Sequence, residues 1–136
     1  MFVNLVFLWL SILNGHATGS LNIKLNRPLH QGKILVYIYN DALGFPTQPE
    51  DAYRTIVIKC SHTKQLKIDR LPFGMYAIIL IHDQNANGKL DRNWLGLPAE
   101  PYALTGHPKF RFGPPLFDDV QFEFKQNGQI LFLDLK

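Results

Sequence analysis

Hydrophobic and polar residues alternate with a period of two along much of the chain, which is the pattern of half-buried β-strands. Residues 21–25 alternate in this way, and residues 55–60 and 66–68 repeat the pattern. Residues 34–39 and 76–81 are instead unbroken apolar and aromatic runs. Such runs are expected of central strands that are covered on both faces. The pattern therefore predicts outer strands with one polar face and two central, fully buried ones.

The end of the chain carries a hairpin signal. Apolar side chains alternate through residues 120–124 and again through residues 131–135, with Asn127-Gly128 between them. Asn-Gly favours a two-residue turn with positive φ angles, so we predict that these two segments pair as a hairpin. With them the count reaches seven strands, and nothing between them has a helical stripe beyond one turn within residues 48–54. The expected fold is all-β: a single seven-stranded antiparallel β-sandwich, transthyretin- or Ig-like.

A long segment, residues 91–119, lacks any strand pattern. It contains Pro98, Pro101, Pro108, Pro114 and Pro115, with three glycines among them. Loops of this length are uncommon in compact domains unless they are functional or held in place. We therefore expect a Pro/Gly-rich loop that presents a surface for a ligand or partner.

The N-terminus has the features of an export signal. Residues 2–13 are almost wholly apolar, and small residues follow at Gly15, Ala17 and Gly19. This pattern predicts a signal peptide over residues 1–19, cut after Ala17 or Gly19, and a mature domain over 20–136. No Lys or Arg precedes the apolar stretch, so an uncleaved anchor or a buried strand stays open. The prediction places the protein in the periplasm or outside the cell, with no integral membrane span after cleavage.

Composition limits the classes of function. The 136 residues are 46% hydrophobic and 18% charged, as in an ordered globular domain. The net charge is +3, but the basic residues are scattered singly, so no nucleic-acid-binding patch is predicted. Cys60 is the one cysteine and continues an alternation with Ile56 and Ile58, so we expect a buried free thiol.

The segment after the second apolar run has the ligand spacing of a calcium loop. Counting from Asp83, oxygen-bearing side chains fall at positions 1, 3, 5 and 9, a glycine falls at position 6, and position 7 offers a backbone carbonyl. The residues are Asp83, Asn85, Asn87, Asp91, Gly88 and Lys89. The sequence therefore predicts a structural Ca²⁺ site in this loop.

The match to an EF-hand is incomplete. Position 12 is Trp94 in place of the bidentate Glu, and a strand pattern enters the loop where a helix should. Glu100, Asp118 or Asp119 could supply the missing carboxylate. Few carboxylates indicate an affinity of about 0.1–1 mM. A turn capped by its own Asp and Asn side chains, without metal, is the alternative.

Two further functions stay open at this point. His82, Glu100 and His107 could form a metal-dependent hydrolase centre. The protein could also be a metal-free structural component of the cell envelope. No phosphate-binding loop, nucleophile elbow or metalloprotease His pair occurs in the chain.

Several segments together resemble the bacterial DUF2141 family of exported proteins, whose function is unassigned. They are residues 71–78, 82–91, 96–102 and 112–120, and the similarity runs from about Leu21 to Leu135. The resemblance implies export and a β-sandwich, and it implies no activity. After Tyr102 the chain reads Ala-Leu-Thr where Gly-Phe-Ser is common in the family.

The stretch Leu71-Pro72-Phe73-Gly74-Met75-Tyr76 is also similar to transthyretin-like modules, in which such a turn leads into a core strand with an anchoring Tyr. This similarity implies a prealbumin-like fold. The hydroxyisourate hydrolases of that fold end in Tyr-Arg-Gly-Ser, whereas this chain ends Leu-Asp-Leu-Lys. Their activity is therefore not expected here.

Overall fold

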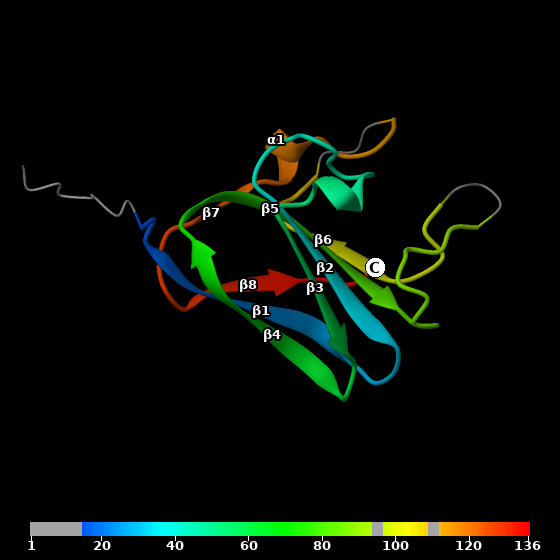
Figure 1. The fold of residues 1–136 in the computed structure, drawn as a ribbon. Helices are drawn as coiled ribbons and strands as arrows, with labels where there is room; N and C mark the ends of the chain where they lie inside the picture. The colour runs from blue at the N-terminus through cyan, green and yellow to red at the C-terminus, as the bar shows by residue number, and fades with distance from the viewer. Residues whose placement is uncertain (1–14, 94–96, 109–111) are drawn as a thin grey trace, which may run out of the picture.

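The computed structural model describes residues 15–93, 97–108 and 112–136, and within them the chain is all-β. The described residues form eight strands, one short α-helix and one 3₁₀ turn (Figure 1). In chain order they are β1 (Thr18–Leu29), β2 (Lys33–Tyr39), η1 (Pro49–Asp51), β3 (Arg54–Lys59), β4 (Thr63–Pro72), β5 (Gly74–Asp83), β6 (Tyr102–Leu104), α1 (Phe117–Val120), β7 (Phe122–Phe124) and β8 (Gln129–Leu133). The 3₁₀ turn η1 lies where the sequence predicted one helical turn.

The strands form two sheets. One has the order β4-β1-β8, and the other has the order β3-β2-β5-β6 with β7 added beside β5. All pairs are antiparallel except β1 and β8, which run parallel from Leu21↔Gln129 to Leu25↔Leu133. The expectation of seven strands in a wholly antiparallel arrangement is therefore wrong in both number and direction.

The strand that the sequence did not predict is β6. It has three residues and lies in the Pro-rich segment after Pro101. Its residues pair with Ile79, Leu80 and Ile81 of β5. Three residues are too few to establish a period of two, so the sequence of this segment does not predict a strand. The strand is defined by its pairing with β5.

The predicted terminal hairpin is wrong as well, although its turn exists. Gly128 has a φ of 82°, and the Gln129 amide donates to the Gln126 carbonyl. The turn binds the start of β1, since the Gly128 amide donates to the Ser20 carbonyl at 2.7 Å and Asn127 Oδ1 accepts from the Ser20 amide at 2.8 Å. This contact directs β8 along β1, while β7 stays with β5 in the other sheet.

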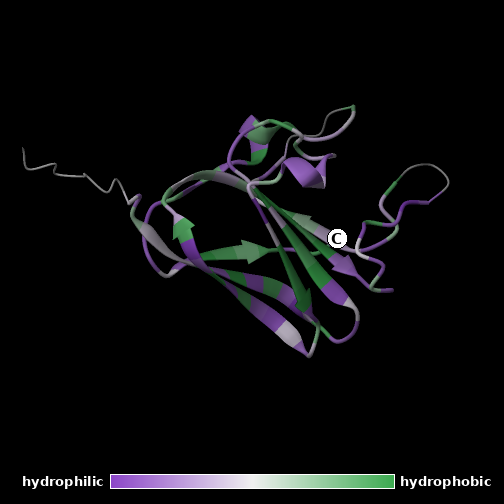
Figure 2. Cartoon of the chain, in the orientation of Figure 1, coloured by the Kyte–Doolittle hydropathy of each residue, from purple (hydrophilic) through white to green (hydrophobic). Residues whose placement is uncertain are grey.

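The central strands of the five-stranded sheet, β2 and β5, are buried on both faces. One core cluster joins alternate residues of β2 and β5 to residues of β1 and β4 in the three-stranded sheet. A second cluster lies on the opposite face and consists of Leu35, Tyr37, Tyr39, Ala77, Ile79, Ile81, Phe117 and Val120, with Phe45 and Leu90 packed against it. Figure 2 shows hydrophobic residues along most of β2 and β5 and a mixture on β1 and β4. This confirms the prediction of two central strands covered on both sides.

Cys60 lies in the cluster between the sheets and is 6% exposed. Ile56 and Ile58 are partly buried against the same cluster. Burial raises the pKa of the Cys60 thiol, which disfavours the reactive thiolate. The expectation of a buried free thiol is confirmed.

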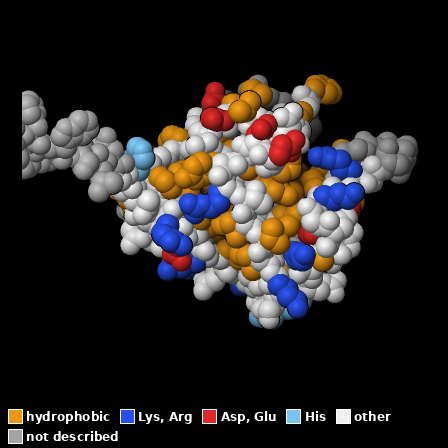
Figure 3. Space-filling view, viewed as in Figure 1, with side chains coloured by type: hydrophobic (Ala, Val, Ile, Leu, Met, Phe, Trp, Pro, Cys, Tyr) orange, Lys and Arg blue, Asp and Glu red, His pale blue; other side chains and the backbone are white. Residues whose placement is uncertain are grey.

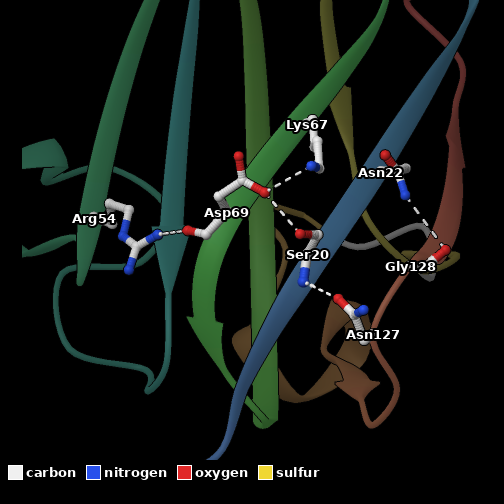
Figure 4. A network of polar contacts seen from close by, with 7 residues as sticks. All are labelled: Ser20, Asn22, Arg54, Lys67, Asp69, Asn127 and Gly128. Carbon is white, nitrogen blue, oxygen red and sulfur yellow. Dashed lines mark hydrogen bonds and ion pairs between the residues drawn. The ribbon is translucent and has the colours of Figure 1, made fainter.

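Backbone hydrogen bonds connect the two sheets on one side of the molecule, and side-chain hydrogen bonds connect them on the other. On the first side, Lys136 and Tyr102 exchange two backbone hydrogen bonds, which join the end of the chain to β6. On the other side, the Arg54 guanidinium from β3 donates to the carbonyls of Asp69 and Arg70 in β4, each at 2.9 Å. Figure 4 shows the first of these two hydrogen bonds. On the face seen in Figure 3, hydrophobic side chains reach the surface in the middle, with Lys and Arg around them.

The carboxylate of Asp69 also takes part in this network and is expected to titrate below its usual range. A hydrogen bond from Ser20 (2.7 Å) is the largest cause of the lowered pKa, and Lys67 (3.1 Å) adds to it. A lowered folded-state pKa contributes stability above the unfolded value of about 3.9, and that contribution is lost as pH falls through the folded value. In Ser20→Ala, an NMR titration should give an Asp69 pKa closer to the unfolded value. An unchanged pKa in Ser20→Ala would show that the hydroxyl does not act on Asp69.

Candidate metal site

The loop predicted to bind calcium begins at the last residue of β5. Asp83 is fully buried, and its two oxygens accept from the backbone amides of Asn87 (3.1 Å) and Gly88 (2.7 Å). Ala86 and Gly88 have φ angles of 57° and 84°, and these left-handed conformations wrap the chain around the carboxylate. The glycine at position 6 thus serves the sharp turn that the motif requires.

The other predicted side-chain ligands come together beside it. The Asn87 amide nitrogen donates to Asp91 Oδ1 at 2.7 Å, and the Asn85 amide nitrogen donates to Asp91 Oδ2 at 2.5 Å. The Asn87 side-chain oxygen accepts from the backbone amide of Lys89 at 3.1 Å. Positions 1, 3, 5 and 9 of the loop therefore share one hydrogen-bond network.

Glu100 is brought back to this network by the segment that follows the loop. Asp91 and Ala99 are joined by a backbone hydrogen bond of 2.8 Å, and Asn93 and Leu97 by one of 2.9 Å. Glu100 is 7% exposed, and its oxygens accept from the amides of Gln84 (2.9 Å) and Asp91 (3.1 Å).

Of the three acids considered for the missing carboxylate, Glu100 is the one that reaches the loop. Asp118 and Asp119 belong to α1, which covers the sheet near Phe45, whereas the loop follows the far end of β5 (Figure 1). Trp94, at position 12 of the motif, lies outside the described residues.

All six carboxylate oxygens of Asp83, Asp91 and Glu100 accept a hydrogen bond from the loop. Each such oxygen has two lone pairs, so one hydrogen bond leaves capacity for a cation. Among the described residues, no group of three or more His, Cys, Asp or Glu side chains is arranged to hold a metal ion.

Two contacts that support the loop, and one electrostatic effect of its first residue, were not predicted. Leu90 packs its side chain against the second core cluster, and an apolar residue within a polar loop was the available signal. Gly32, in the turn before β2, lies so close that an added Cβ would be 2.2 Å from the Asp83 carbonyl oxygen. Burial raises the pKa of Tyr37, and the nearby Asp83 charge raises it further.

The three residues of the hydrolase hypothesis have separate surroundings. His82 is buried, and its Nε2 lies 2.8 Å from the Gln31 carbonyl oxygen. His107 is exposed and lines a surface hollow of about 590 Å³ with Tyr102 and Asp134. Glu100 binds the loop, as described above. The described contacts give this hypothesis no support.

Fold and site together define an all-β domain of two sheets with a carboxylate-rich loop at the end of a central strand. The chain belongs to a family described as an uncharacterized protein conserved in bacteria (DUF2141), whose model matches residues 26–131. No curated protein and no solved structure matches the chain. None of the helices in the described residues has the length and apolar character needed to cross a membrane.

Proposed function

We propose that this protein is an exported, non-enzymatic β-sandwich module whose loop 83–91 binds a structural Ca²⁺ ion. The observation that carries the proposal is the convergence of Asp83, Asp91 and Glu100 on one short segment together with the amides of Asn85 and Asn87. Three carboxylates concentrate negative charge there, and hard oxygen donors are the ligands that calcium prefers.

Ion binding requires a small rearrangement of this network. The amide nitrogens of Asn85 and Asn87 donate to Asp91, so both amides must turn their oxygens toward the ion. Asp83 and Asp91 supply carboxylate oxygens, and Lys89 supplies its carbonyl at position 7. Glu100 either stays bound to the two backbone amides or completes the ligand set. Exchanging existing hydrogen bonds for metal contacts is consistent with the modest affinity expected from the sequence.

The role of the ion in this proposal is to hold the segment that follows the loop. That segment carries β6 and several of the residues that line the hollow beside His107. Glu100 already joins it to both ends of the loop. An ion shared by the same network would fix residues 97–108 to the sheet for binding of a ligand or protein partner.

Export and the fold relationship are part of the same proposal. β1 begins at Thr18, so cleavage after Ala17 leaves the strand whole, whereas cleavage after Gly19 removes two of its residues. We therefore favour Ala17 as the last residue of the signal. The transthyretin-like relationship is supported by Tyr76, whose hydroxyl donates to the Pro72 carbonyl at 2.7 Å where the chain passes from one sheet to the other.

Calcium is expected to stabilise the folded protein. With 10 mM Ca²⁺ and a Kd of about 0.1–1 mM, binding to the native state alone adds about 1.4–2.7 kcal/mol to the free energy of unfolding. Thermal unfolding of the wild type should shift upward with Ca²⁺ relative to a metal-free buffer of equal ionic strength. Asp83→Asn removes one ligand charge and should abolish most of the shift.

The matched control is Asp41→Asn. Asp41 also accepts a hydrogen bond from a backbone amide, that of Leu43, but lies in a different loop. This variant should keep the full calcium response. No shift in the wild type, or equal shifts in Asp83→Asn and the wild type, would contradict calcium binding. Either result would favour a self-capped loop without metal. The six hydrogen bonds to the carboxylates are the observation that supports this alternative.

A further inference from the structure

Two exposed histidines from distant parts of the chain meet at the end of the molecule. His30 follows the last residue of β1, and His62 precedes the first residue of β4. Leu29 and Thr63 are cross-strand partners, so the next positions outward face each other. The Cys60 amide donates to the Gly32 carbonyl at 3.0 Å, which ties the two turns together. Figure 1 shows these turns side by side.

The two imidazole rings present the same nitrogen to each other. Their Nδ1 atoms are 3.2 Å apart, and the ring centroids are 4.7 Å apart with the planes inclined by 64°. His62 has a φ of 54°, a left-handed conformation that costs a non-glycine residue about 1–2 kcal/mol. The backbone thus holds His62 in an uncommon conformation that directs its ring at His30.

This separation matches the bite of a two-histidine metal site. Imidazole nitrogen binds zinc at about 2.0–2.1 Å, so two ligands at the tetrahedral angle are about 3.3 Å apart. At a right angle, as in tetragonal copper sites, the same bond lengths give about 2.9 Å. The observed Nδ1–Nδ1 distance lies between the two. The distance between the two nitrogens therefore fits an ion that is bound by both of them.

We propose that His30 and His62 form a bis-imidazole site for a transition-metal ion, with Zn²⁺ and Cu²⁺ as the fitting ions and water in the remaining positions. Lys33, Lys59 and Lys64 are near in sequence and place positive charge around the turns. A hard cation held mainly by charge is therefore disfavoured, whereas borderline ions with a strong preference for imidazole are not. This selectivity separates the site from the calcium loop.

Zinc titration of untagged protein tests the proposal, with 10 mM Ca²⁺ present throughout to occupy the carboxylate loop. Calorimetry should show one Zn²⁺ bound per chain. His30→Ala and His62→Asn should each weaken binding at least tenfold, and NMR resonances of both imidazoles should respond to Zn²⁺ in the wild type. Asn is used at position 62 because it tolerates the left-handed conformation.

The matched control is His107→Ala, which removes another exposed histidine from a different part of the fold. It should bind Zn²⁺ as the wild type does. Both tested side chains are exposed, so circular dichroism should confirm that the variants stay folded. The proposal is overturned if wild type and variants bind Zn²⁺ equally, or if the wild type binds none. In either case the Nδ1–Nδ1 contact is a hydrogen bond and not part of a metal site.

Discussion

Gly32→Ala is expected to lower the free energy of unfolding by about 3 kcal/mol or more. Gly32 has a φ of 77°, and an added Cβ would lie 2.2 Å from the Asp83 carbonyl oxygen and 2.9 Å from Gln84 Cα. Both contacts are to backbone at the junction of β5 and the loop, so no side chain can move aside. Urea denaturation of the wild type and the variant measures the difference.

Gly128→Ala is the matched control, because Gly128 has a similar φ of 82° but no atom within 4 Å of an added Cβ. It should cost only the conformational strain of about 1–2 kcal/mol. Equal losses in the two variants would show that the contact between Gly32 and Asp83 adds nothing to the strain. Gly32→Ala should also displace Asp83 and so weaken any calcium response.

Thr105→Val is expected to cost about 2–4 kcal/mol although the two side chains have nearly the same shape. The Thr105 hydroxyl is buried, accepts from the Ile78 amide at 3.0 Å and donates to the Val120 carbonyl at 2.9 Å. It therefore connects β5 to α1, and valine would leave both backbone groups without that partner. Chemical denaturation gives the cost, and hydrogen exchange at the Ile78 amide should accelerate in Thr105→Val.

Thr105→Ser tests whether the hydroxyl is responsible. Serine keeps both hydrogen bonds and loses one methyl group, so a loss near 1 kcal/mol is expected. If serine and valine destabilise the protein equally, the methyl group rather than the hydroxyl matters at this position.

The sequence pattern predicted the central strands because burial on both faces leaves a direct trace in composition. β2 and β5 are continuous apolar runs, and both are covered on each side. The pairing partner of each strand cannot be predicted from composition in this way. The turn at Asn127-Gly128 is local, but the path of β8 is set by contacts with Ser20 at the opposite end of the chain.

The same division applies to the site. The spacing from Asp83 to Asp91 predicted which side chains converge, because a tight loop brings alternate residues to one centre. From the sequence, three acids were candidates for the missing carboxylate. The antiparallel return of residues 97–99 brings one of them, Glu100, to the backbone amide of Asp91. The support from Gly32 was not predictable, since it depends on how two turns pack.

The parallel pair of β1 and β8 joins residues 21–25 to residues 129–133. Nearly the whole domain lies between these two strands, so the three-stranded sheet cannot be completed from neighbouring segments. Pairing over such a distance carries a large loop-closure entropy and slows folding relative to hairpin-based sheets. Until β8 arrives, one edge of β1 stays unpaired and able to bind other extended chains. The nascent domain is thus most vulnerable to aggregation in the interval before its final strand docks.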